Sequence, residues 1–170
     1  MNTGRRKERS ILTVDPGTGG TGLAFWDRDA WFDQKSLSLK KDFRLRPVFN
    51  VSIGYAEVEK YMHQIRRFAL YFNATDAFIE NSSAMAGAKG HMVANSGRLV
   101  TLSQYIGRLI QLFRYEGMGA HLVSVQKWKG TLPKDVVKRR ILRIWPECSA
   151  TNHDWDAVGI GMYLTGMINQ

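Results

Sequence analysis

Three stretches of the sequence carry acidic or imidazole side chains that strand ends and a helix would bring to one place. Asp15 and Glu80 each end a short apolar run typical of a buried strand. His153 and Asp156 stand three residues apart at the start of a predicted helix, so both lie on one helical face. Three carboxylates and one imidazole form a hard, oxygen-rich donor set, which favours Mg²⁺ or Mn²⁺ over zinc. These residues therefore predict a divalent metal site.

Residues 17–22 (GTGGTG) match the glycine pattern of dinucleotide-binding proteins. That fingerprint needs a helix beginning in the glycines, whereas residues 23–26 have the composition of a strand. The glycines fit a tight turn between antiparallel strands, with Asp15 at its mouth. An acid there repels a bare phosphate but attracts one through a divalent cation. The alternative is turn chemistry alone, with the Asp15 side chain bonding the turn amides.

The elements that would position these side chains form an α/β domain. Hydrophobic patterning predicts a hairpin, a third strand and then alternating helices and strands, so the mixed sheet is antiparallel at the start and parallel where helices cross over. The expected strands cover residues 11–14, 22–26, 30–39, 75–79 and 121–125, and the expected helices cover 55–72, 96–115, 133–145 and a last segment from 151 or 152 to 168. Residues 40–50 are expected to form a basic connection.

Length and composition limit the class of protein. The chain has 170 residues, enough for one domain, and we expect residues 1–9 to be a flexible basic arm and residues 10–170 the domain. The net charge of +9 favours an anionic partner, nucleic acid first. No apolar run approaches the roughly 18 residues of a membrane span, and a cytoplasmic location is expected. The single cysteine, Cys148, excludes an internal disulfide.

Three motifs together resemble those of a known family. They are ILTVDPGT at residues 11–18 with the later Gly22, AFIEN at residues 77–81, and HDWDA at residues 153–157. In this order and spacing they resemble the RuvC-type Holliday junction resolvases of the RNase H-like superfamily. Residues 128–130 (WKG) and 132–134 (LPK) look most like the bacteriophage branch. The resemblance extends from residue 11 to residue 168.

The resemblance implies an RNase H-like fold with a mixed five-stranded sheet flanked by helices. It also implies a homodimer that binds a four-way DNA junction and nicks two opposed strands, with two Mg²⁺ (or Mn²⁺) ions per active site. The positions that match the family's metal-binding tetrad, which are also the catalytic residues, are Asp15, Glu80, His153 and Asp156. Two-metal hydrolysis of this kind would leave 5′-phosphate and 3′-hydroxyl ends.

Basic residues supply the expected DNA contacts. Lys129 and Lys134 fall where the family places lysines near the scissile phosphate, with Lys127 as an alternative to Lys129. Further phosphate contacts are expected from Lys40, Lys41, Lys89, Lys138 and Arg139, although charged faces are often only solvated. The family often carries an aromatic residue three positions after the glutamate, where this chain has Ser83. Trp128 and Trp155 are expected in the core.

Other functions remain open at the level of the sequence. A nuclease of the same superfamily could act on branched DNA in general or on RNA–DNA hybrids. An actin-like ATPase lobe also begins with a strand and an Asp-x-Gly-Thr loop, but it needs a second lobe for which this chain has no room, so no nucleotide cofactor is expected. A junction-binding module without catalysis is disfavoured by the acids at all matched positions.

Overall fold

The computed structural model describes residues 10–17, 20–28, 43–52, 58–81, 97–150 and 152–168. The helices and strands follow one another as β1 (Ser10–Pro16), β2 (Gly20–Arg28), β3 (Phe43–Ser52), α1 (Val58–Tyr71), β4 (Asp76–Asn81), α3 (Arg98–Tyr115), β5 (Gly119–Ser124), α4 (Val125–Trp128), α5 (Lys134–Ile144) and α6 (Asn152–Leu164). None of the helices in these parts of the chain has the length and hydropathy that a bilayer crossing requires.

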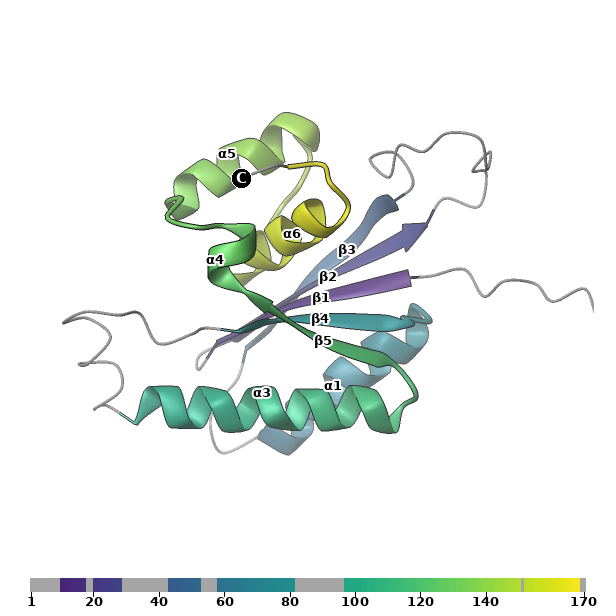
Figure 1. Cartoon of the computed structure of the whole chain (residues 1–170). Coiled ribbons are helices and arrows are strands. Elements are labelled where there is room, and N and C mark those ends of the chain that lie inside the picture. The colour runs from purple at the N-terminus through teal and green to yellow at the C-terminus, as the bar shows by residue number, and fades with distance from the viewer. Residues whose placement is uncertain are drawn as a thin grey trace, which may run out of the picture.

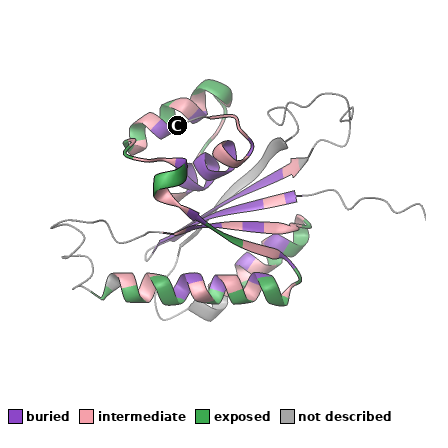
Figure 2. Cartoon of the chain, in the orientation of Figure 1, coloured by how far each residue is buried: buried purple, intermediate pink, exposed green. Residues whose placement is uncertain are grey.

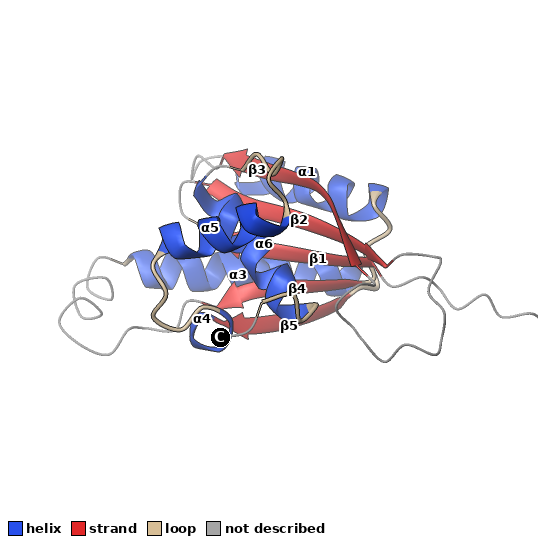
Figure 3. Cartoon of the chain, turned by 90° about the horizontal axis from the view of Figure 1, so that it is seen from above, coloured by secondary structure: helices blue, strands red, loops and turns tan. Residues whose placement is uncertain are grey.

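The strands form one five-stranded mixed sheet in the order β3-β2-β1-β4-β5. β1 pairs antiparallel with β2, and β2 with β3, whereas β1, β4 and β5 run parallel. Parallel neighbours need a crossover, and α1 and α3 occupy the two connections into β4 and β5. The predicted α/β fold with a mixed five-stranded sheet is confirmed (Figure 3).

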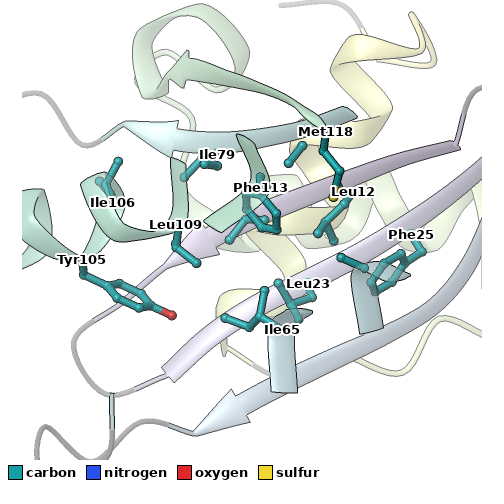
Figure 4. Packing of buried hydrophobic residues seen from close by; sticks show 13 residues of the cluster. Leu12, Leu23, Phe25, Ile65, Ile79, Tyr105, Ile106, Leu109, Phe113 and Met118 are labelled. Carbon is teal, nitrogen blue, oxygen red and sulfur yellow. The ribbon is translucent and has the colours of Figure 1, made fainter. Parts of the chain in front are cut away.

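Helices cover both faces of the sheet, with α1 and α3 on one face and α4, α5 and α6 on the other (Figure 1). Alternation along β1 explains this arrangement, because successive side chains point to opposite faces. Leu12 and Val14 pack with α1 and α3, where Leu109 and Phe113 are fully buried (Figure 4). Ile11, on the other face of the strand, packs against the second cluster, to which α6 contributes. Figure 2 shows the buried interior that results.

Helix α6 lies unusually close to the sheet because it carries glycines where rings press against it. A Cβ atom at Gly161 would lie 2.0 Å from the Trp26 indole, and one at Gly159 would lie 2.5 Å from the Trp128 ring. The Thr13 hydroxyl donates a hydrogen bond of 2.7 Å to the Ala157 carbonyl, and Trp26 Nε1 donates to the Thr13 hydroxyl at 3.0 Å. These contacts hold the middle of α6 against β1, β2 and α4.

Three sequence predictions about elements need correction. Residues 43–52 form β3, although the sequence predicted a basic connection over residues 40–50. The register shifts opposite Ala24 and Trp26, which places Arg46 and Pro47 at a bulge of this edge strand, where proline is tolerated. Helix α4 was not predicted, and α6 ends at Leu164 rather than reaching residue 168. The strand expected at residues 30–39 and the arm at residues 1–9 lie outside the described residues.

Candidate functional site

Asp15 and Glu80 lie side by side at one end of the sheet. The last paired residues of β1 and β4 are Val14 and Ile79, so the next residues in register are the two acids. Paired residues of parallel strands point to the same face, and here that face is the one covered by α6. Both side chains are buried, with 5% of Asp15 and 8% of Glu80 exposed. The sequence prediction that both acids reach one sheet edge is consistent with this placement.

The first turn of α6 brings His153 onto Asp15. His153 Nδ1 lies 2.8 Å from Asp15 Oδ2 and donates a hydrogen bond to it. Glycines make room for this turn, because a Cβ atom at Gly22 would lie 2.3 Å from the His153 carbonyl oxygen and one at Gly17 would lie 2.5 Å from His153 Cε1. The glycines that resemble a dinucleotide fingerprint therefore admit the backbone and ring of His153.

Asp156 is held between two lysines. Its Oδ1 lies 3.1 Å from Lys129 Nζ and its Oδ2 lies 2.9 Å from Lys134 Nζ. Lys129 extends from the turn after α4, and Lys134 begins α5. The structure thus places both predicted lysines against a predicted metal ligand, and between the alternatives Lys127 and Lys129 it is Lys129 that pairs with Asp156.

The electrostatics of Glu80 show that the three carboxylates share one environment. Burial raises the pKa of the Glu80 carboxyl to about 8, and the charges of Asp15 and Asp156 act in the same direction. A hydrogen bond of 3.0 Å from Trp128 Nε1 to Glu80 Oε2 and the charge of Lys129 lower it in part. Two further anions near a buried carboxyl favour its protonated form. A cation bound beside Glu80 would favour the ionised form of this carboxyl.

The pKa of His153 is also raised, but here the favoured protonated form is the charged one. The hydrogen bond to Asp15 is the main cause of the raised pKa of His153, and burial opposes it. A carboxylate that accepts from Nδ1 stabilises the protonated imidazole. Two protonated groups, His153 and Glu80, consequently lie at the same site under mildly acidic conditions.

Metal-free protein should lose stability as the pH rises from about 5 to about 8. Folded Glu80 keeps its proton up to a pKa of about 8, whereas the ordinary value is 4.5, so the folded state binds more protons in this window. More protons bound in the folded state mean that the free energy of unfolding falls with pH, by at most about 1.4 kcal/mol per unit for one group. His153 acts in the same direction above its ordinary pKa of 6.5.

Urea unfolding of wild type and Glu80→Gln between pH 5 and pH 8.5 measures this effect. The variant should show a flatter stability profile, because the contribution of His153 remains and that of Glu80 is gone. An equally steep profile in both proteins would contradict the assignment of a raised pKa to Glu80.

The donor set fits a hard divalent cation in chemistry and charge. Carboxylate oxygens suit Mg²⁺ or Mn²⁺, and a bound cation would offset the burial that raises the pKa of Glu80. Within the described residues, however, no group of three or more His, Cys, Asp or Glu side chains is already arranged as a metal-binding cluster. The acids are instead paired with His153, Trp128 and the lysines. Cation binding would therefore exchange some of these partners for metal.

The remaining predicted DNA-binding residues are dispersed. Lys138 and Arg139 lie exposed on α5; Lys138 Nζ is 5.2 Å from the centre of the Trp155 ring, and Arg139 pairs with Asp135 at 3.3 Å. Lys127 is exposed on α4. Lys40, Lys41 and Lys89 lie outside the described residues, as does Ser83.

One functional contact was missed from the sequence. Trp128 was expected only to fill the core, and with 2% of its surface exposed it does so, as does Trp155 with 7%. The Trp128 indole also donates a hydrogen bond to Glu80, a contact that the sequence did not predict. The available signal was a tryptophan between two lysines directly after the last strand, at residues 127–129.

Comparisons with known proteins are informative at the level of structure. No protein-family model matches the chain, and no curated protein matches it in sequence. The fold is similar to that of RuvC from Thermus thermophilus, both alone (TM-score 0.63, 15% identity, 91% of this chain and 92% of RuvC covered) and in complex with a Holliday junction substrate (TM-score 0.65, 15% identity, 91% of each chain). It is also similar to the yeast mitochondrial Holliday junction resolvase (TM-score 0.54, 14% identity, 91% of this chain and 77% of that one). The chain therefore has the fold of RuvC, an RNase H-like mixed sheet with helices on both faces.

Proposed function

We propose that this chain is a Holliday junction resolvase, a metal-dependent endonuclease that nicks opposed strands of four-way DNA junctions. The observation that carries the proposal is the placement of buried Glu80 beside Asp15 and Asp156 at the edge of a RuvC-like sheet, where burial first and the two charges second raise its pKa. Three acids at one sheet edge, two of them with basic partners, suit a site that binds cations and phosphate, because the paired carboxylates can exchange their partners for a metal ion and each freed basic group can bind phosphate.

In this proposal Asp15, Glu80, His153 and Asp156 would hold two Mg²⁺ or Mn²⁺ ions. Bound there, the metal would activate a water and stabilise the leaving oxygen, which gives 5′-phosphate and 3′-hydroxyl ends. Asp15 orients His153 through the 2.8 Å hydrogen bond, so one imidazole nitrogen is fixed and the other is directed away from Asp15. The chain thus supplies ligands whose orientation is set before DNA arrives.

Lys129 and Lys134 would bind the phosphate at the cut. Both ammonium groups stand at Asp156, within 3.1 Å of its oxygens, so they concentrate positive charge at an otherwise acidic site. If Asp156 bound a cation instead of the lysines, the two ammonium groups would be available to bind DNA phosphate. Binding of metal and of DNA would support each other through this exchange.

The proposal includes a homodimer of the bacteriophage-like branch. A four-way junction has two equivalent strands to cut, and two nicks placed symmetrically require two active sites related by a two-fold axis. The branch assignment is supported by the segments at residues 128–134, which include Lys129 and Lys134.

The test is cleavage of a synthetic mobile four-way junction, with each strand labelled in turn, with and without Mg²⁺. We expect two symmetric nicks with 5′-phosphate ends in Mg²⁺ and none in EDTA. Parallel reactions on duplex, flap and RNA–DNA hybrid identify a broader nuclease. Equal cutting of all substrates would refute junction selectivity, and no cutting of any would refute the nuclease proposal.

Junction affinity should fall steeply with salt, and α5 should carry part of that dependence. Each phosphate contact adds about 0.9 to the slope of log affinity against log salt. Replacing exposed Lys138 and Arg139 together with alanine should therefore flatten the slope by about 1–2. The Arg139–Asp135 ion pair is weak because both side chains are more than 70% exposed, so Arg139 can exchange it for phosphate.

Fluorescence anisotropy of a labelled junction between 50 and 200 mM KCl gives the slope. Arg67→Ala is the matched control, since Arg67 is exposed on α1, on the opposite face of the sheet. An identical slope in wild type and the α5 variant would remove this helix from the DNA-binding surface.

A further inference from the structure

We infer that Trp128 is a positioning residue of the metal site, because its indole N–H fixes the carboxylate of Glu80. Trp128 Nε1 donates to Glu80 Oε2 at 3.0 Å, and both side chains are buried. This hydrogen bond occupies one carboxylate oxygen and restricts the orientation of the group. The inference rests on the proposed function, since it gives a role to the surroundings of the same site.

The indole cannot easily leave this position. Gly159 of α6 lies against the ring so closely that a Cβ atom there would be 2.5 Å from Cζ3. Val137 of α5 belongs to the same buried cluster, and its Cγ1 would lie 3.1 Å from that Cβ atom. Trp128 is held by packing on its ring, so its N–H is directed rather than free to rotate.

The backbone carries the indole to Glu80 by a short route. Glu80 of β4 pairs in register with Val123 of β5, and α4 begins two residues later without an intervening loop. The Lys129 and Gly130 amides both donate to the Val125 carbonyl, at 2.9 and 3.1 Å, which closes the short helix immediately after the tryptophan. The strand pairing that places Glu80 therefore also places its donor.

Consecutive residues of this segment reach two different acids. Trp128 contacts Glu80, and Lys129 contacts Asp156 at 3.1 Å while its ammonium lies 5.4 Å from the centre of the Trp128 ring. The lysine can exchange Asp156 for DNA phosphate, but the neutral indole has no such alternative partner. Trp128 is accordingly the fixed support and Lys129 the mobile one.

Loss of a hydrogen bond that orients a metal ligand typically lowers metal affinity by about 10–100-fold. Trp128→Phe retains the ring and removes the N–H, so it should weaken Mn²⁺ binding by about that factor in DNA-free protein. Electron paramagnetic resonance of Mn²⁺ during titration measures the affinity without relying on cleavage. Metal-free junction binding should be unchanged.

The matched control is Trp26→Phe, which removes an equivalent indole bond from the same buried cluster. Trp26 Nε1 donates to Thr13 rather than to an acid. We expect Trp26→Phe to lower the melting temperature and to leave Mn²⁺ affinity within about twofold. In a Glu80→Gln background, Trp128→Phe should cause no further loss, because the two residues act through one contact.

A second measurement uses the unmodified protein. The indole N–H resonance of Trp128 should move as Mg²⁺ is added, while that of Trp26 stays in place. Equal Mn²⁺ affinity in the Trp128→Phe and Trp26→Phe proteins, or an unmoved Trp128 resonance at saturating Mg²⁺, would overturn the inference even in an enzyme that cuts junctions. A wild type that binds Mn²⁺ through these acids but cuts no DNA would refute the proposed function and leave the role of Trp128 standing.

Discussion

Asp15→Asn and Asp156→Asn should each reduce junction cleavage by roughly 10³-fold or more while four-way junctions still bind. Each substitution keeps the size of the side chain and removes one negative charge from the acid cluster around Glu80. Asp15 also orients His153, and Asp156 holds Lys129 and Lys134, so each variant weakens a second function of the site. Binding should persist because the basic residues remain and the site becomes less repulsive toward phosphate.

Single-turnover cleavage with saturating protein separates the chemical step from binding. Asp76→Asn is the matched control, because Asp76 begins the strand that carries Glu80 but pairs with His121, at 3.2 Å, away from the acids. Its cleavage rate should stay within about twofold of wild type. Normal nicking by Asp15→Asn or Asp156→Asn would remove these residues from the active site.

Gly22→Ala should destabilise the protein by about 3 kcal/mol or more and abolish cleavage. The added methyl group would lie 2.3 Å from the His153 carbonyl oxygen and 2.7 Å from the Asp154 amide nitrogen. Both are backbone atoms that cannot yield as a flexible side chain does, so the start of α6 must move away from the sheet. The cost should therefore lie at or above the upper end of the roughly 1–3 kcal/mol typical of overpacking. At this chain length the melting temperature should fall by about 6–12 °C.

Cleavage should fail in Gly22→Ala even below the melting transition, because a displacement of 1 Å at a catalytic group can cost about 100-fold in rate. The control is Gly107→Ala in α3, where an added Cβ meets no atom within 4 Å and alanine favours the helix. That variant should be as stable as wild type or more so. A Gly22→Ala protein that melts and cuts like wild type would show that α6 does not depend on this close contact.

The acids of the site were predictable because local sequence places them. Asp15 and Glu80 each end an apolar run, and neighbouring parallel strands present such ends together. His153 and Asp156 follow from helical spacing alone. The contacts between these side chains could not be predicted. The pairing of His153 with Asp15 joins residues 138 positions apart, and the pairing of both lysines with Asp156 depends on how α4 and α5 pack on α6.

The differences between the predicted and the observed elements have physical causes. β3 was interpreted as a basic connection because its arginines and Pro47 obscure the alternation, and an edge strand with a bulge tolerates both. α4 has four residues, too few for a helical period to show. The glycines of α6 lower its helix propensity, and only the Trp26 and Trp128 rings, brought close by the sheet, explain why they are there.

The central position of β1 divides the site into a rigid half and an adaptable half. β1 is hydrogen-bonded to a neighbour on each side and covered by a cluster on each face, so Asp15 can shift only if the whole sheet opens. Asp156 stands on α6, which is buried between the sheet and α5, whereas Lys129 and Lys134 extend from the turn after α4 and from α5, and their side chains are 18% and 38% exposed. We therefore expect accommodation to a bent or distorted nucleic acid backbone to come from the side chains of Lys129 and Lys134, with the strand as the fixed reference.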